Sequence, residues 1–312
     1  LGDVRLLVRR DVADDGPTAV PNVEENDIAK LKAGYNAACA VAPMAVEHVR
    51  PIYTVTRVAR FAECPRRDDL IYRLGLPRDL LVEAEAEFDF DADDRAGENE
   101  ATRLTAADFG SLFHEAMERW DADEATIPAT LDGMHKRRDI DKTTRKALSQ
   151  GMHQFARHEL GAAARAGTAV RELALAWPVE DAESSSNDKI RLLRGTIDLC
   201  VVGNEGVTIV DYKTDRVHGD EAVKAEKYAA QLLLYADGAE RYFRKPVSRA
   251  VLYFARSDTA VDVDLSPERR SEAAALVQRF FDAERTGTAP EGEGVCAGCP
   301  HLEICSDWVP HS

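Results

Sequence analysis

Apolar positions recur at helical spacing in the first half of the chain. Between 106 and 120 they form one stripe at i, i+3 and i+4 spacing, which predicts an amphipathic helix. The stripe consists of Phe109, Leu112, Phe113, Ala116, Met117 and Trp120. A helical pattern also covers 54–76, where Pro65 predicts a break. After a polar insert, a further helix is predicted near 141–165.

The pattern changes after residue 168, where runs of β-branched and apolar residues predict strands. These runs are 170–179, 192–202, 207–213 and 249–256. A hairpin turn is predicted at 203–206 and a helix at 220–243. Ser266 and Pro267 begin a second helix as N-cap and first residue, and Gly287 ends it. The order predicts an α/β fold, a mixed β-sheet core flanked by helices with a helical insert.

The 312 residues suit one elaborated α/β domain or two domains. We assign 1–50 to a linker or tail and 51–312 to the domain itself, with an acidic loop at 85–104. Because the chain begins with Leu1, we expect a piece cut from a longer polypeptide. Apolar runs stay short of a membrane span, and six cysteines without a secretory signal favour the reducing cytoplasm.

The net charge of −16 reflects 56 acidic against 40 basic residues, and stretches such as Asp89–Asp94 are densely acidic. Such a balance ordinarily argues against nucleic-acid binding, which needs a basic surface. The composition also resembles that of proteins from halophilic archaea, whose acidic surfaces stay hydrated in concentrated salt. In that solvent electrostatic repulsion is screened, so the charge does not exclude a DNA substrate.

Two acids and a lysine interrupt the predicted hairpin. Asp211 and Lys213 end the run VTIVDYKTD and point to the same side of their strand, while Asp198 lies on the preceding strand. The turn brings Asp198 against them, and two converging carboxylates repel unless a cation lies between them. Oxygen ligands select Mg²⁺ or Mn²⁺. The alternative is a buried Asp211–Lys213 ion pair with an unrelated Asp198.

Four motifs in order resemble a known signature. They are Gly110–His114 (GSLFH), Gly195–Asp198 (GTID), Val210–Thr214 (VDYKT) and Gln231–Tyr235 (QLLLY). Over roughly residues 52–308 the chain thereby resembles the RecB-type branch of the PD-(D/E)XK nuclease superfamily. The resemblance implies a restriction-endonuclease-like fold and hydrolysis of DNA phosphodiester bonds with Mg²⁺ or Mn²⁺.

The resemblance also implies roles for single residues. The implied metal ligands are His114, Asp198, Asp211 and Tyr212. The implied catalytic residues are Asp198, Asp211, Lys213, Gln231 and Tyr235. Glu172 resembles an acid found one strand earlier in relatives, and it is a candidate for a residue that orients a metal ligand without binding the metal itself. Thr214 is a candidate for a hydroxyl that lies near the DNA phosphate. Without the resemblance, a histidine at position 114 is more often a surface or capping residue, and a tyrosine at an apolar position such as 235 is usually a core residue. We expect four other histidines to be solvated: His135, His153, His158 and His218.

Three cysteines near the end of the chain, Cys296, Cys299 and Cys305, have the spacing C-x₂-C-x₅-C, and Cys64 stands far upstream. A zinc ribbon normally has a second C-x₂-C pair. The arrangement resembles the iron–sulfur staple of AddB-type nucleases and CRISPR-associated adaptation nucleases, which implies a 4Fe–4S cluster on these four thiolates. The alternative is a zinc site that uses His301 in place of Cys64. The remaining cysteines, Cys39 and Cys200, are predicted core residues.

These features together predict a metal-dependent deoxyribonuclease. The resemblance implies an exonuclease of the PD-(D/E)XK type, while the residues themselves leave exonuclease and endonuclease open. We expect the nuclease module of a helicase–nuclease that processes DNA ends in recombinational repair, with DNA and an upstream helicase motor as partners. The alternatives are a stand-alone nuclease of the CRISPR-adaptation type and a non-catalytic DNA-binding module of a helicase. Inactive relatives usually lose an acid or the lysine, so the presence of His114, Asp198, Asp211 and Lys213 favours activity.

Overall fold

The chain divides into two units, Leu1–Val49 and Arg50–Ser312. The computed structural model describes most of the second unit. The described residues are 51–76, 106–137, 140–184, 189–215, 217, 219–288, 296, 299, 301 and 305. The predicted linker at 1–50 and the acidic loop at 85–104 therefore lie outside the described residues, as do Cys39 and His218.

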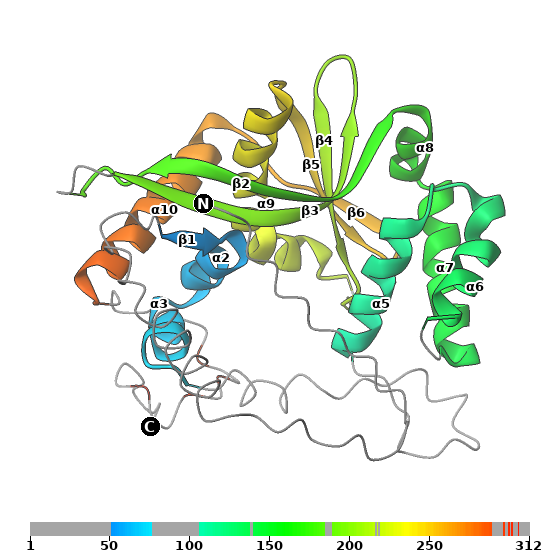
Figure 1. Cartoon of the computed structure of the whole chain (residues 1–312), viewed down its shortest axis with the longest axis horizontal. Helices are drawn as coiled ribbons and strands as arrows, with labels where there is room; N and C mark the ends of the chain where they lie inside the picture. Colours follow the sequence, from blue (N-terminus) through cyan, green and yellow to red (C-terminus); the bar gives the residue numbers. More distant parts are fainter. Residues whose placement is uncertain are drawn as a thin grey trace, which may run out of the picture. The chain divides into compact units, whose positions relative to one another are not determined.

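The described strands form one mixed six-stranded sheet (Figure 1). Its strands are β1 (Ile52–Thr54), β2 (Thr168–Glu180), β3 (Ile190–Val202), β4 (Val207–Lys213), β5 (Val247–Phe254) and β6 (Thr259–Asp262). The long strand β3 pairs antiparallel with β2 along one edge. Its other edge is shared, since β1 pairs parallel with its beginning and β4 antiparallel with its end. Beyond β4 follow β5, which is parallel to it, and the antiparallel β6.

The shared edge of β3 has an opening in it. The ladder with β1 ends at Arg194 and the ladder with β4 begins at Leu199. Within the described part of the sheet, 195–197 pair with β2 alone, and the registers of β3 with its neighbours skip Asp198. This opening contains Gly195 and Asp198, the two ends of the GTID motif.

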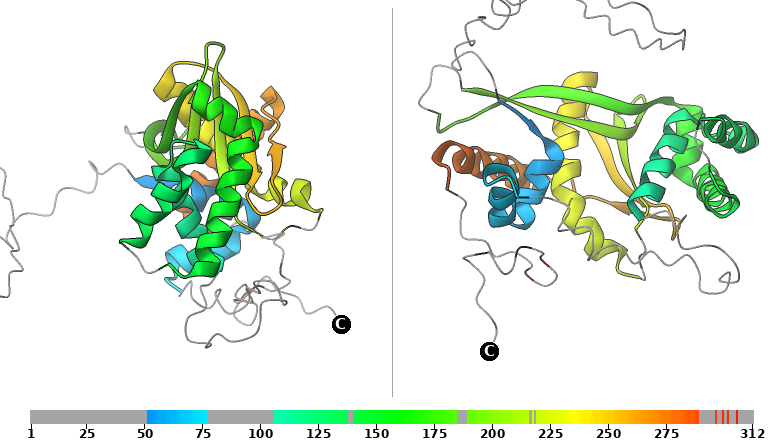
Figure 2. Two further views of the ribbon diagram at one scale, coloured as in Figure 1. Left: turned by 90° about the vertical axis from the view of Figure 1, so that its right-hand side faces the viewer. Right: turned by 60° about the horizontal axis from the view of Figure 1, so that its bottom comes forward.

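Helices cover both faces of the sheet. They are α2 (Val55–Glu63), α3 (Pro65–Asp68), the π-helical turn η2 (Asp69–Arg73), α5 (Ala106–Arg119), the 3₁₀ turn η6 (Glu124–Thr126), α6 (Ile127–His135), α7 (Lys142–Arg157), α8 (Glu159–Ala166), α9 (Glu221–Phe243) and α10 (Pro267–Thr286). Side chains of α2, α9 and α10 build one hydrophobic core, and those of α5 to α8 build the other. Figure 2 shows the ribbons of both groups of helices from two further directions. Among the described helices, none is long and apolar enough to cross a bilayer.

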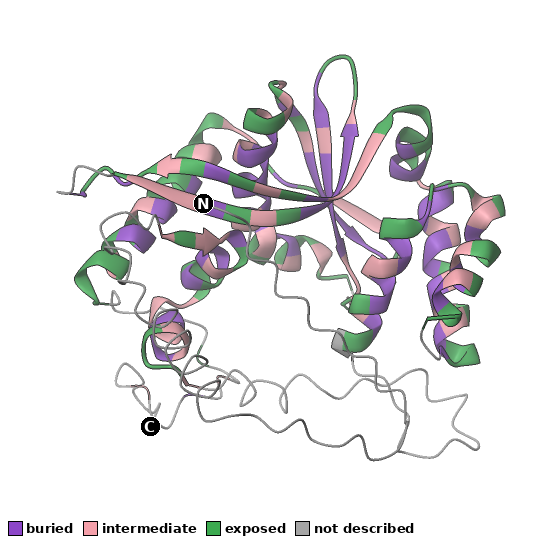
Figure 3. Ribbon diagram, in the orientation of Figure 1, coloured by how far each residue is buried: buried purple, intermediate pink, exposed green. Residues whose placement is uncertain are grey.

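The central strands contribute apolar side chains to both cores. Figure 3 shows these strands as largely buried. In β3, Leu193 and Ile197 face the core of α2, α9 and α10, whereas Leu199 and Val201 face the other core. Side chains two positions apart lie on the same face of a regular strand. The alternation of β3 therefore slips by one residue at Asp198, which marks this acid as an irregular point of the strand.

Most predicted elements are confirmed, and the differences have local causes. The helix predicted at 141–165 is two helices, because His158 adopts an extended backbone conformation between them and its Nδ1 accepts a hydrogen bond from the Leu160 N–H at 3.2 Å. His158 is thus a helix cap and not simply solvated. The polar insert contains α6, whose apolar side chains are buried: Ile127, Leu131 and Met134. The sequence pattern also missed the short edge strands β1 and β6.

The junction of α7 and α8 depends on the absence of a side chain at Gly161, because a Cβ there would overlap the carbonyl oxygen of Phe155. We predict that Gly161→Ala lowers the free energy of unfolding by about 1–3 kcal/mol through this clash. The matched control is Gly133→Ala in α6, where a Cβ meets nothing within 4 Å. The control should be stabilised by about 0.4–1 kcal/mol, because alanine restricts the unfolded chain. Urea unfolding of both variants measures the difference, and equal effects would contradict this account.

Candidate metal centre and catalytic site

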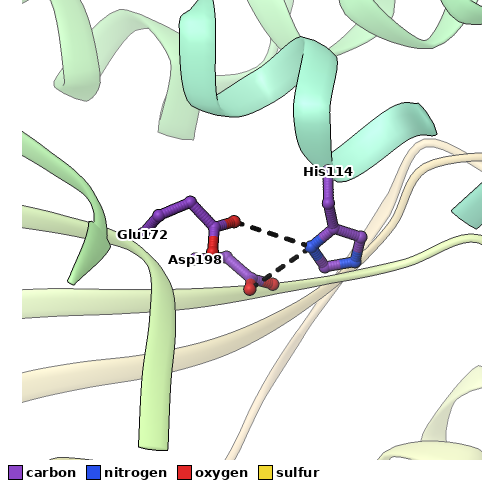
Figure 4. A group of neighbouring side chains, drawn as sticks. All are labelled: His114, Glu172 and Asp198. Atoms are coloured by element: carbon purple, nitrogen blue, oxygen red, sulfur yellow. Dashed lines mark ion pairs between the residues drawn. The ribbon is translucent and has the colours of Figure 1, made fainter. Parts of the chain in front are cut away.

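One imidazole and two carboxylates converge at the opening in β3 (Figure 4). His114 Nδ1 lies 3.3 Å from Asp198 Oδ1 and 3.9 Å from Glu172 Oε1. One ligand atom from each of the three residues lies within 4.8 Å of the others, a spacing that suits a shared cation. They come from α5, β2 and β3, so the group forms only when the helix packs on the sheet.

Strand β2 presents Glu172 through an unusual backbone conformation. Arg171 pairs with Leu199 and Leu173 with Ile197, which places Glu172 opposite Asp198. Its φ is 46°, in the left-handed region that residues other than glycine rarely adopt. Strain of this kind persists where the surrounding structure enforces it and is concentrated at functional sites. Glu172 therefore offers a carboxylate to the same group as His114 and Asp198, whereas its sequence context had assigned it only a supporting position.

Helix α5 approaches the sheet closely enough to deliver His114. A Cβ at Gly110, one turn earlier, would lie 3.1 Å from the hydroxyl oxygen of Thr214, so the glycine of GSLFH admits the end of β4. The rings of Phe113 and His114 each contact the Tyr212 ring edge-on, with centroids 6.0 Å apart. His114 is consequently a half-buried residue oriented toward the acids and not a surface or capping residue.

The charges of the group are strongly coupled. Burial raises the pKa of Asp198 to about 6, and the neighbouring Asp211 acts in the same direction. The Tyr212 N–H donates to Asp198 Oδ2 at 2.7 Å and partly offsets this effect. Burial disfavours the His114 imidazolium, but Asp198 and Glu172 outweigh burial and raise the pKa of His114 to about 10. A positive charge is therefore favoured at this position.

Asp211 and Lys213 form a second group on the α9 side of the sheet. Lys213 Nζ lies 2.7 Å from Asp211 Oδ2, which confirms that the two side chains share one face of β4. Burial lowers the pKa of Lys213, but Asp211 outweighs it and the net shift is upward. Gln231 Nε2 donates to Asp211 Oδ1 at 2.9 Å. The Asp211–Lys213 ion pair that the sequence offered as an alternative thus exists. It lies beside Asp198, because Asp198 and Asp211 are the next positions after Leu199 and Val210, the last residues that pair β3 with β4.

The QLLLY motif packs against this group from α9. Tyr235 Oη lies 3.4 Å from Gln231 Nε2, and a Cβ at Gly195 would lie 2.5 Å from the Tyr235 ring. The glycine of GTID therefore makes room for Tyr235 in the opening of β3. Burial raises the pKa of Tyr235 to about 12, with Asp211 acting in the same direction, so the phenol stays protonated. Gln231 thus contacts both Asp211 and Tyr235.

The Tyr212 side chain is not available as a ligand. Its ring is 2% exposed and packs edge-on against Phe155 and Tyr253, at centroid distances of 5.4 and 6.4 Å. Burial raises its pKa well above the ordinary value. The ring of Tyr212 meets the site only edge-on at His114, and its backbone N–H donates to Asp198.

Cys64 lies close enough to Cys299 for the two thiols to interact electrostatically. Its Sγ accepts a hydrogen bond from the Arg67 N–H at 3.3 Å at the start of α3. Burial raises the pKa of the Cys64 thiol, and Cys299 is among the groups that raise it further. Two residues beyond Cys299, His301 is fully buried and both of its ring nitrogens lack a hydrogen-bond partner. Cys200 is a buried strand residue, as predicted.

Known proteins share parts of this sequence. A profile of the PD-(D/E)XK nuclease superfamily matches residues 53–306. An ATP-dependent helicase/nuclease subunit of Bacillus cereus (strain AH187) is 26% identical over an alignment of 181 residues, which covers 52% of this chain and 14% of that protein. The corresponding protein of Carboxydothermus hydrogenoformans, which has the same name, is 44% identical over 73 residues, which are 23% of this chain and 6% of that protein. The chain thus spans a small part of these relatives.

A solved structure titled "Crystal structure of SSO0001" aligns with a TM-score of 0.44 and 12% identity, and covers 91% of this chain and 98% of that one. The family match is the stronger finding, because it extends over well more than half of the sequence. All four motifs of the candidate site lie inside the matched range. The chain belongs to the PD-(D/E)XK nuclease superfamily.

Proposed function

We propose that this protein is a Mg²⁺- or Mn²⁺-dependent nuclease that hydrolyses phosphodiester bonds of DNA. The observation that carries the proposal is the meeting of His114, Glu172 and Asp198, with ligand atoms within 4.8 Å, next to the Asp211–Lys213 pair. Three carboxylates and one imidazole suit a hard divalent ion. The raised pKa of His114 supports the same conclusion, since this position favours positive charge.

Each residue has a distinct task in this proposal. His114, Glu172, Asp198 and Asp211 hold the ion, which polarises the phosphate and activates water when bound. Lys213 remains protonated, because its pKa is raised, and its ammonium orients the nucleophile and stabilises negative charge on the phosphate. Gln231 fixes the carboxylate of Asp211 through its amide N–H.

We further propose that the domain is the exonuclease module of a helicase–nuclease that processes DNA ends in recombinational repair. The support is its similarity to two proteins that are named as subunits of an ATP-dependent helicase/nuclease. The complete set of acids and the lysine favours catalysis over the alternative of a DNA-binding module without activity. The net charge of −16 supports work in concentrated salt, where screening weakens the repulsion between the acidic protein and DNA.

The catalytic assignment predicts that Asp211→Asn and Lys213→Gln each lower the rate of DNA cleavage by about a thousandfold or more, because each removes a charge needed in the transition state. The measurement is single-turnover cleavage of linear DNA with Mg²⁺ or Mn²⁺. Asp262→Asn is the control, since Asp262 also pairs with a basic residue, Arg249, but on the exposed edge strand β6. Near wild-type rates for either site variant, in folded protein, would refute the assignment.

The metal assignment predicts that Glu172→Gln weakens Mn²⁺ binding by about tenfold or more, because the neutral amide is a poorer ligand than the carboxylate. Titration of the protein with Mn²⁺, followed by electron paramagnetic resonance of the free ion, gives the affinity without any cleavage assay. The control is Glu180→Gln, at the far end of β2. Excess EDTA should stop cleavage in the wild type, and added Mn²⁺ should restore it. Equal affinities of the wild type and Glu172→Gln would exclude Glu172 as a ligand.

We also propose that Cys64, Cys296, Cys299 and Cys305 hold a 4Fe–4S cluster that clips the two ends of the domain together. The influence of Cys299 on the Cys64 thiol supports this, since the two residues come from opposite ends. The four thiols also support the cluster, because the reducing cytoplasm that we expect for this protein keeps cysteines unpaired and able to bind iron. Both ring nitrogens of His301 are buried without a hydrogen-bond partner, so one of them is available to donate an N–H to the cluster.

The cluster proposal predicts that anaerobically purified protein is brown and contains about four irons per chain. Cys64→Ala should lose the colour as completely as Cys299→Ala, because both remove a ligand. Both should also lower stability by a few kcal/mol, since a long loop is no longer closed. Cys200→Ala is the control and should stay brown, because Cys200 is a core residue of β3. Colourless protein with one zinc, indifferent to Cys64→Ala, would support the zinc alternative instead.

A further inference from the structure

Helix α9 contacts the catalytic groups with three residues of one face. Tyr228, Gln231 and Tyr235 follow one another at steps of three and four residues, the spacing of neighbours on a helix surface. Gln231 contacts Asp211, and Tyr235 occupies the space at Gly195. The first of the three, Tyr228, lies outside the QLLLY motif.

Tyr228 covers the amine of the central lysine. Lys213 Nζ lies 4.2 Å from the centre of the Tyr228 ring, within the range of a cation–π interaction. The Tyr228 hydroxyl donates to Asp215 Oδ2 at 3.3 Å, in the segment that follows β4. The ring is therefore held from two sides, by its own helix and by the chain just beyond the lysine.

The ammonium of Lys213 thus lies between a carboxylate and an aromatic face. Its two partners differ in one respect that matters for the proposed reaction. Asp211 is also a proposed metal ligand, so its negative charge is shared when a divalent ion is present. The ring of Tyr228 binds no metal and keeps its attraction for the ammonium unchanged. Little water reaches the amine, since the Lys213 side chain is only 18% exposed, and this strengthens a cation–π contact.

We infer that Tyr228 is a positioning residue for Lys213, whose aromatic ring keeps the ammonium in place for phosphodiester cleavage while Asp211 is engaged with the metal. The inference rests on the proposed nuclease function and adds a residue to its machinery. The essential property is the face of the ring, and the hydroxyl contributes only the contact with Asp215.

Activity tests the role of the ring. Tyr228→Leu should lower kcat by about tenfold or more with little change in KM, because substrate binding is retained while the amine is no longer held. Tyr228→Phe keeps the ring and should retain at least about a third of the wild-type kcat. Tyr242→Leu is the matched control, the same substitution on the same helix at a position 58% exposed. It should cleave DNA like the wild type.

A spectroscopic measurement tests the placement without any activity. Because Lys213 Nζ lies 4.2 Å from the centre of the Tyr228 ring, the protons on the adjacent Cε should experience its ring current. Their NMR signals should therefore be shifted upfield in the wild type and in Tyr228→Phe. The shift should vanish in Tyr228→Leu and persist in Tyr242→Leu. The signal is assigned by its loss in Lys213→Arg. Thermal unfolding and Mn²⁺ affinity should stay close to wild type in Tyr228→Leu, which separates positioning from a loss of folding.

The outcomes distinguish the two proposals. A wild-type protein that fails to cleave DNA with any divalent metal overturns the proposed function, and the NMR shift then decides alone whether Tyr228 holds the lysine. Absence of the upfield shift in the wild type overturns the present inference. So does cleavage by Tyr228→Leu at the wild-type kcat, or an equal loss of kcat in the Phe and Leu variants, since either result would make the ring irrelevant.

Discussion

Buried negative charge at the opening of β3 is the constraint around which this domain is arranged. Asp198 and Asp211 occupy opposite positions on neighbouring strands, and Glu172 faces Asp198 from the other side. Carboxylates so close together in a site of restricted hydration repel one another unless positive charge compensates them. The protein supplies that compensation in two places, with His114 on one face of the sheet and Lys213 on the other.

One helix on each face of the sheet positions side chains at these charges. Helix α5 brings the imidazole to Asp198 and Glu172, and the missing side chain at Gly110 lets it come close to the end of β4. Helix α9 packs on the other face. There Gln231 donates a hydrogen bond to Asp211, and the ring of Tyr228 covers the ammonium of Lys213. Both glycines of the signature, Gly110 and Gly195, thus serve close approach between a helix and a strand. In GSLFH, Gly110 precedes His114 by four positions, and in GTID, Gly195 precedes Asp198 by three. In each motif the glycine admits a neighbouring element and the polar residue faces the site.

The same arrangement accounts for the strain in β2. A regular strand would alternate its side chains past Asp198 without interruption, yet both strands change the face they present near this point. The left-handed conformation of Glu172 directs a third carboxylate into the group at some cost in backbone energy. Packing on both sides of the sheet offsets this cost, because the central strands lie between two hydrophobic cores.

The sequence by itself determined the elements and most of the chemistry. Apolar periodicity located the α5 stripe, and the hairpin turn placed Asp198 against Asp211, because turns and side-chain alternation are local properties. It could not decide what Glu172 does or how Tyr212 is used. Those answers depend on a φ value of 46° and on an aromatic cluster built from four separate elements, and such features arise only when distant segments pack together. The contact of Tyr228 with Lys213 belongs to the same class, since only the docking of α9 on β4 brings ring and ammonium together.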